Sequence, residues 1–163
     1  MNEISVLAPA TVSNVVCGFD CLGFALEEPF DEMTVRRIDE RTVSIINRDD
    51  YGLPTDPTRN VAGVALLAML DAIQADFGFE VEIAKHIKPG SGIGSSAASA
   101  CGVVVAANRI LGDRFSPIEL IDLAMAGESK SRSFGERCKA VRLSGIAFVY
   151  SDGRRVQIGR AHV

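Results

Sequence analysis

The stretch "IKPGSGIGSSAASACGVVVAAN", residues 87–108, combines residue types that could do chemistry. Three glycines stand at alternate positions from Gly90 to Gly94, Ser95 and Ser96 follow, and an apolar run begins directly afterwards. Glycine permits a positive φ and lets the backbone come close to a ligand. A helix that starts after such a turn presents unpaired N–H groups and the positive end of its dipole. The pattern therefore indicates a phosphate site, where both serines could add hydroxyls to phosphate or to a magnesium ion.

Two common phosphate-binding motifs do not match this stretch. A Walker A loop places Lys and then Ser or Thr after its last glycine. Here Gly94 is followed by two serines, and Lys88 precedes the loop. A dinucleotide-binding fingerprint needs a third glycine where this sequence has Ser95, and it follows the first strand of its fold. From local physics alone, a tight turn into a core helix without any ligand is the remaining alternative.

The segment "EISVLAPAT" predicts a first strand with a break at Pro9. Three further segments alternate apolar and polar residues with a period of two, which is typical of strands with one solvated face. They are "EMTVRRI", "RTVSIIN" and "FEVEIAKHI", which leads into the glycine stretch. Prolines and aspartates in "RDDYGLPTDPTRN" predict a turn-rich loop. Near the end of the chain, "SGIAFVYSDGRRVQIG" predicts a hairpin around Asp152-Gly153.

Three further segments have the composition of helices. "VAGVALLAMLDAIQADFG" predicts a helix that ends at Gly78. "SSAASACGVVVAANRILG" is apolar on nearly every side and predicts a buried helix, capped by Ser95 or Ser96 and ended by Gly112. "FSPIELIDLAMAGE" predicts a helix that begins with a cap, a proline at the first helical position and a capping box, formed by Ser116, Pro117 and Glu119. Strands and helices that do not alternate strictly favour an α+β fold.

The composition excludes several classes of protein. A chain of 163 residues with 47% hydrophobic and 23% charged residues is typical of one globular domain. A net charge of −4 argues against a nucleic-acid partner. The start lacks a signal-peptide pattern, and the apolar runs are too short to span a bilayer. The four cysteines form no C-x-x-C pair, and two histidines cannot complete a zinc pattern with them. We therefore expect a cytoplasmic protein without a membrane partner.

The whole of "PGSGIGSSAAS" resembles the phosphate-loop signature of the GHMP kinases, P-x-x-x-G-[LI]-G-S-S-A-A: the seven defined positions from Gly92 to Ala98 agree, and Pro89 stands one residue nearer to the first of them than in the signature. The resemblance implies the α+β fold of the GHMP kinase N-terminal domain, which is ribosomal protein S5 domain 2-like and contains a left-handed β-α-β unit. It also implies ATP as the cofactor. The ATP-binding residues would be Pro89, Gly90, Ser91, Gly92, Ile93, Gly94, Ser95, Ser96, Ala97, Ala98 and Ser99, with Asn60 as a weaker contact to the adenine.

A second stretch, "APATVSNVVCGFDCLGFAL", resembles the N-terminal motif of the homoserine kinase branch, P-A-T-S-A-N-x-G-x-G-F-D-x-L-G-x-A-L. It departs from that motif at Val12, Ser13 and Val16. The resemblance implies phosphorylation of the L-homoserine hydroxyl by ATP, which gives O-phospho-L-homoserine for threonine biosynthesis. It covers residues 4 to about 128, and a homodimer is compatible with it.

The same resemblance implies the substrate and metal contacts. Asn14 and Asp20 would bind homoserine, Asp20 through the ammonium group and Asn14 through its amide at the reacting end. Ser96 and Glu128 would hold Mg²⁺, which bridges phosphates and neutralises developing charge. No side chain is assigned as a catalytic base, because the substrate hydroxyl in this branch is thought to lie directly against the γ-phosphate.

The resemblance breaks after Glu128. The family continues with a His-Asp-Asn stretch whose histidine contributes to the homoserine site, whereas the next histidine here is His162. Codons for residues 133–138, shifted by one base, can read His-Ser-Glu-Asn-Val-Ala, so the gene sequence tests a frameshift hypothesis. We expect residues 1–150 to form the N-terminal ATP-binding domain, disrupted after about 128, and residues 151–163 to be an atypical tail.

Members of the family also have a C-terminal domain, which we expect to be absent from this sequence. We therefore expect an incomplete homoserine kinase with little or no activity of its own, and turnover of homoserine by the purified chain would overturn that expectation. One alternative is another GHMP small-molecule kinase, such as a mevalonate or sugar kinase. The other is a non-catalytic nucleotide-binding fragment, which would bind ATP without phosphorylating any alcohol.

Overall fold

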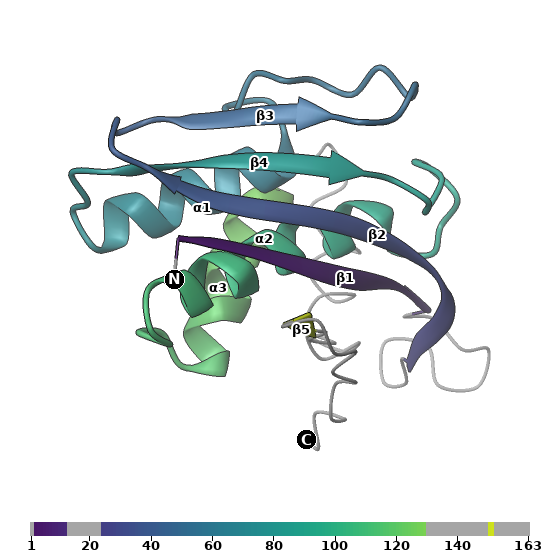
Figure 1. Cartoon of the computed structure of the whole chain (residues 1–163). Helices are drawn as coiled ribbons and strands as arrows, with labels where there is room; N and C mark the ends of the chain where they lie inside the picture. Colours follow the sequence, from purple (N-terminus) through teal and green to yellow (C-terminus); the bar gives the residue numbers. More distant parts are fainter. Residues whose placement is uncertain (1, 13–23, 130–149, 152–163) are drawn as a thin grey trace.

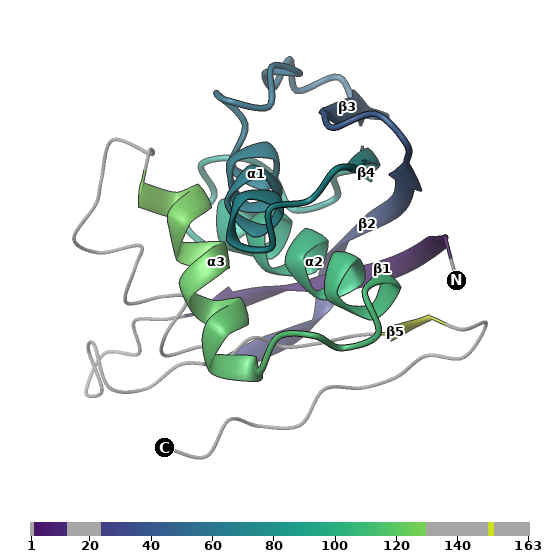
Figure 2. The same ribbon diagram turned by 90° about the vertical axis from the view of Figure 1, so that its left-hand side faces the viewer.

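The structure is a computed structural model, and it describes residues 2–12, 24–129 and 150–151. These residues form one five-stranded sheet and three helices. The strands are β1 (Glu3–Val12), β2 (Phe24–Ile38), β3 (Val43–Asn47), β4 (Gly78–Ala84) and β5 (Tyr150–Ser151). The helices are α1 (Val61–Ala72), α2 (Ser95–Ile110) and α3 (Pro117–Ser129). All three helices cover the same face of the sheet (Figures 1 and 2), so the predicted α+β class is confirmed.

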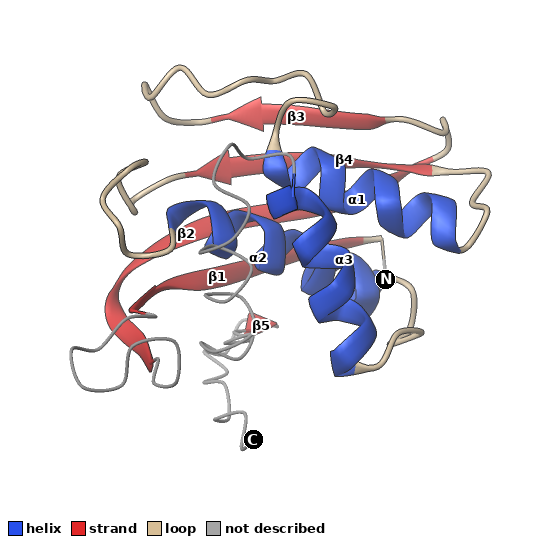
Figure 3. Cartoon of the chain, turned by 180° about the vertical axis from the view of Figure 1, so that it is seen from behind, coloured by secondary structure: helices blue, strands red, loops and turns tan. Residues whose placement is uncertain are grey.

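The strand order is β3-β4-β2-β1-β5. Within the described ranges, β3 and β4 pair in parallel and the other neighbours are antiparallel. The parallel pair is joined through α1. In Figure 1 both strands run to the right, and β4 lies below β3. Figure 3, the view from behind, shows α1 in front of the sheet, so in Figure 1 this helix lies behind the two strands. This crossover is therefore left-handed, as the family resemblance implied and against the general rule for parallel connections.

Helix α2 lies directly against the sheet because one of its residues has no side chain. A Cβ added at Gly102 would lie 2.2 Å from Met33 Cε and 3.2 Å from Ala8 Cβ, which is closer than the packing allows. Val103, Val104 and Val105 in the same helix are buried. The close contact fixes α2 against β1 and β2, and with it the position of the loop that precedes the helix.

Helix α1 ends earlier than its sequence predicts. The predicted stop was Gly78, but α1 ends at Ala72, and Gln74 has a φ of 49° that interrupts helical geometry. Gly78 instead begins β4. A Cβ there would lie 2.0 Å from the carbonyl oxygen of Thr42, so this glycine permits a close backbone approach. Gly78 therefore serves the pairing of strands and does not end a helix. Apolar composition alone does not distinguish the end of the helix from the start of the following strand.

The predicted capping box at the start of α3 is confirmed. Pro117 is the first helical residue, and the carboxylate of Glu119 accepts hydrogen bonds from the hydroxyl of Ser116 at 2.7 Å and from its N–H at 2.8 Å. These two bonds, the hydroxyl contribution being the larger, hold the pKa of Glu119 below its usual value. A carboxyl group whose pKa is lowered on folding stabilises the folded state when the pH is above its pKa in the unfolded chain. This stabilisation is lost as the pH falls through its pKa in the folded protein.

We expect Ser116→Ala to reduce the free energy of unfolding at pH 7 by about 1 kcal/mol, because the cap is lost. The difference between the variant and the unaltered chain should shrink between pH 5 and pH 3, roughly, as Glu119 becomes protonated in both. Urea unfolding followed by circular dichroism across this pH range measures it. Asp122→Asn, an exposed change in the same helix, serves as the control. A difference that stays constant with pH would contradict the expectation.

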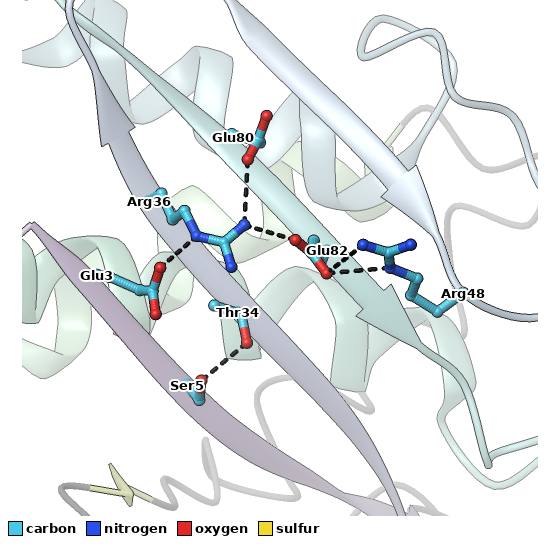
Figure 4. Close-up of polar contacts among 7 residues, drawn as sticks. All are labelled: Glu3, Ser5, Thr34, Arg36, Arg48, Glu80 and Glu82. Carbon is cyan, nitrogen blue, oxygen red and sulfur yellow. Dashed lines mark hydrogen bonds and ion pairs between the residues drawn. The ribbon is translucent and has the colours of Figure 1, made fainter.

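The face of the sheet opposite the helices carries a network of charged side chains (Figure 4). Arg36 on β2 binds Glu3 on β1 and, on β4, Glu80 at 3.1 Å and Glu82 at 2.5 Å. Glu82 also binds Arg48 at 2.9 Å. The hydrogen bonds from Arg36, and next those from Arg48, hold the pKa of Glu82 below its usual value. Arg36, in the middle of this network, thus binds three carboxylates, which compete with any anion for its charge.

Candidate phosphate-binding site

The segment between β4 and α2 contains three glycines in the left-handed region. Their φ angles are 79° at Gly90, 81° at Gly92 and 76° at Gly94. Residues that carry a side chain rarely adopt a positive φ. The need for this backbone conformation therefore explains why glycine stands at these three alternate positions. A Cβ at Gly90 or Gly92 would meet no atom within 4 Å. Both positions therefore border open space, and a ligand can approach the loop backbone there.

Helix α2 begins without a side-chain cap. Its N-cap is Gly94, so the prediction that Ser95 or Ser96 caps the helix is wrong. Ser95 is the first helical residue, and its hydroxyl donates instead to the carbonyl of Ile87 at 2.9 Å. The first N–H groups of an α-helix have no partner within the helix. An uncapped helix start without an acidic residue in its first turn leaves these donors and the positive dipole end available for an anion.

A buried ion pair lies beneath the loop. Lys85 Nζ lies 2.5 Å from Asp31 Oδ2, and the two side chains are 2% and 0% exposed. The same ammonium donates to the carbonyl of Ser95 at 3.0 Å and to Ser99 Oγ at 2.7 Å. An ammonium has three protons, and all three are used in these bonds. Lys85 therefore holds the start of α2 in place and has no proton left to donate to a ligand.

The carboxylate of this pair fixes the other end of the loop. Asp31 Oδ1 accepts hydrogen bonds from the N–H groups of His86 and Ile87, both at 2.8 Å. Asp31 belongs to β2, whereas the two donors follow directly after β4. Buried charges are tolerated when they are paired and hydrogen-bonded, and this pair meets both conditions. The network therefore connects two strands, the loop and α2 into one rigid support.

This ion pair was not predicted, although the sequence contains a signal for it. In β4 the buried residues Phe79, Val81 and Ile83 alternate with more exposed ones, and Lys85 continues the buried series. On β2, Asp31 occupies the corresponding place before Met33 and Val35. A charged residue at an inward position on each of two paired strands indicates a buried ion pair.

Some of the predicted ATP contacts lie at the loop, whereas the side chains of Ser99 and Asn60 are hydrogen-bonded within the protein. The glycine loop and the half-buried Ser96 lie at the site described above. Ser99 is buried, and its hydroxyl is engaged by Lys85 and Ser95. Asn60 is the N-cap of α1, where its Oδ1 accepts from Ala62 N at 3.0 Å. Both ends of the Asn60 amide are thus bonded within the protein, since Nδ2 donates to the carbonyl of Pro54 at 2.7 Å.

Other predicted site residues lie outside the described residues. Asn14 and Asp20 fall in the gap between β1 and β2, and the predicted hairpin at Asp152-Gly153 follows β5. Glu128 belongs to α3, but its side chain is not among those described. In the described ranges, three or more His, Cys, Asp or Glu side chains do not gather into a metal site. No helix in these ranges is both long enough and apolar enough to cross a membrane.

Known proteins resemble this chain in sequence and in fold. Residues 60–137 match the family model described as the GHMP kinases N terminal domain. A homoserine kinase of Chloroherpeton thalassium is 40% identical over 140 residues, which are 78% of this chain and 44% of that protein. The homoserine kinase of Xanthomonas campestris pv. campestris is 44% identical over 131 residues, with 79% and 41% covered. The crystal structure of homoserine kinase from Cytophaga hutchinsonii matches with a TM-score of 0.82 and 36% identity, covering 96% of this chain and 52% of that one.

The structure defines a domain of the α+β class, in which the glycine loop is a candidate phosphate site. Together, this structure and these similarities show that the chain belongs to the GHMP kinase family. The curated relatives named above are homoserine kinases, and the chain spans less than half of their length.

Proposed function

We propose that this chain is the ATP-binding part of a homoserine kinase, which transfers the γ-phosphoryl group of ATP to the hydroxyl of L-homoserine. The loop between β4 and α2 carries the proposal. It joins three left-handed glycines to an uncapped helix start and rests on a buried ion pair. Phosphoryl transfer is catalysed mainly by positioning and by stabilisation of charge. A rigid loop whose N–H donors bind the triphosphate would supply both.

Magnesium suits the oxygen donors proposed for it. Ser96 offers a hydroxyl at the first turn of α2, and Glu128 would add a carboxylate from α3. Mg²⁺ prefers oxygen ligands and is usually bound by one or two carboxylates together with substrate phosphates. When bound there, it would supply positive charge that neutralises the charge developing during transfer.

The proposed homoserine contacts follow β1 in the sequence. Asn14 comes three residues after Thr11, and three residues of extended chain span at most about 11 Å. The N–H of Thr11 donates to the carbonyl of Ile93 in the glycine loop at 3.0 Å. The chain therefore enters the segment with Asn14 and Asp20 from beside the loop. This position supports an alcohol subsite close to the phosphates, with Asp20 for the ammonium group of homoserine.

A chimeric enzyme tests the proposed function. Residues 2–128 would replace the corresponding segment of the Cytophaga hutchinsonii homoserine kinase, so that a complete C-terminal part is present. We expect the purified chimera to phosphorylate L-homoserine with ATP and Mg²⁺, and to phosphorylate mevalonate poorly. Asp20→Asn in the chimera should raise the KM for homoserine more than the KM for ATP.

Two results would contradict the proposal. A folded chimera that binds ATP but phosphorylates no alcohol would favour the non-catalytic alternative. A chimera that prefers mevalonate or a sugar would move the substrate to another branch of the family. The unaltered Cytophaga enzyme, assayed in parallel, controls for the conditions.

A further inference from the structure

The hydroxyl oxygen of Thr11, on β1, is a buried polar atom. Thr11 is 9% exposed, and its Oγ1 has no acceptor or donor within reach in the part of the chain that the structure describes. A buried hydroxyl without a partner destabilises a protein, because it has lost its bonds to water. Such groups are rare in native proteins, and each one requires an explanation.

An irregularity in the sheet turns this hydroxyl toward the helices. Alternation along β1 directs Ile4, Val6, Ala8 and Ala10 inward, so the following residue would normally face outward. The register with β2 shifts between Pro9 and Thr11, however, and Ala10 and Thr11 are both buried. Bulges of this kind often re-aim a side chain next to a functional site. The predicted break at Pro9 is therefore a shift in register within a continuous strand.

The re-aimed hydroxyl lies at the start of α2. A Cβ added at Gly94, the N-cap residue, would lie only 2.4 Å from Thr11 Oγ1. The N–H of Thr11 binds the carbonyl of Ile93, the residue before that cap. The hydroxyl thus stands beside the N–H groups that the uncapped helix leaves unpaired. Hydroxyl and N–H groups can all donate, so they can bind one negatively charged oxygen together.

We propose that Thr11 is a further binding residue, whose hydroxyl donates a hydrogen bond to a phosphoryl oxygen of the bound nucleotide. This inference rests on the proposed function and adds to it a residue outside the glycine loop. It explains why a polar side chain is buried there without a partner, since the partner arrives with the ligand. It also explains the register shift, which is what brings Thr11 to the loop.

The substitution Thr11→Val tests the inference, because valine has nearly the same shape and lacks the hydroxyl. Without nucleotide, the variant should unfold at a higher temperature by about 2–4 °C, since an unsatisfied polar group is removed. Its dissociation constants for ATP and ADP should rise about 10- to 100-fold, the value of a hydrogen bond to a charged group. Binding of adenosine should not change. Titration calorimetry on the full 163-residue chain measures all three ligands.

Two control variants accompany the test. Thr34→Val makes the same change on the opposite face of the sheet, where Thr34 Oγ1 bonds Ser5 Oγ at 2.8 Å, and it should leave ATP affinity unchanged. Thr11→Ser keeps the hydroxyl and should retain most of the affinity for ATP. A loss of ATP affinity in Thr11→Ser as large as that in Thr11→Val would show that keeping the hydroxyl does not preserve binding, which overturns the inference.

The outcomes also separate this inference from the proposed function. If the unaltered chain binds ATP and Thr11→Val binds it equally well, the hydroxyl has another partner, such as a buried water, and only the inference fails. If the unaltered chain binds neither ATP nor ADP, the proposed function fails and the inference fails with it. Higher thermal stability together with weaker ATP binding in Thr11→Val is the combination expected here.

Discussion

Replacement of Lys85 by methionine is expected to lower the free energy of unfolding by about 3–5 kcal/mol, the usual cost of removing one partner of a buried ion pair. The variant leaves the carboxylate of Asp31 buried at 0% exposure without its counter-charge. It also removes the bonds from the ammonium to Ser95 and Ser99 at the start of α2. Guanidinium unfolding followed by circular dichroism measures the change.

Two further variants make this result specific to the ion pair. Lys88→Met makes the same change at an exposed position three residues later and should alter stability by less than about 0.5 kcal/mol. The double variant Lys85→Met/Asp31→Asn removes both charges but keeps an oxygen for the N–H groups of His86 and Ile87, and it should recover part of the loss. Similar losses in Lys85→Met and Lys88→Met would mean that the buried pair does not support the loop.

The substitution Gly94→Ala is expected to weaken ATP binding about 100-fold, the effect that a displacement of about 1 Å can have in a positioning site. Alanine at this position must adopt a φ of 76°, and its Cβ would lie 2.4 Å from Thr11 Oγ1. Either the side chain of Thr11 or the backbone at the start of α2 must therefore move. Titration calorimetry with ATP measures the loss, and the thermal unfolding temperature reports the accompanying strain.

Gly90→Ala is the matched control for this prediction. Gly90 has nearly the same φ, 79°, but its added Cβ would meet nothing within 4 Å. The cost is then restricted to left-handed backbone strain of about 1–2 kcal/mol. We expect a clearly smaller loss of ATP affinity than in Gly94→Ala. Equal losses in the two variants would attribute the effect to backbone strain alone and not to the position of the helix start.

The sequence predicted the parts of this fold that depend on local chemistry. The glycine loop, the buried helix after it and the capping box at Ser116 each follow from the preferences of neighbouring residues. The GHMP resemblance added the left-handed crossover, which no local pattern indicates. Where a helix and a strand met without a strong boundary, as between α1 and Gly78, composition placed the end six residues too late.

The remaining features of the site depend on contacts between distant segments. Ser95 was a plausible cap by type, but Gly94 takes that place because the loop must turn through a left-handed residue there. The pair of Asp31 and Lys85 joins residues 54 positions apart, and the register of two strands brings them together. The burial of Thr11 depends on a register shift between β1 and β2. Periodicity within one segment cannot reveal such pairings.

The central claim is that the loop before α2 binds the triphosphate of ATP, and nuclear magnetic resonance of the labelled chain tests it most directly. A chain of 17.4 kDa is suitable for assignment of the backbone amides. On addition of ATP with Mg²⁺, we predict that the largest shifts occur at the amides of residues 90–98, and that adenosine alone leaves these amides unchanged. Two results would contradict this claim. One is that the largest shifts appear at the outer face of the sheet around Arg36, and the other is that ATP and adenosine cause equal shifts at the loop.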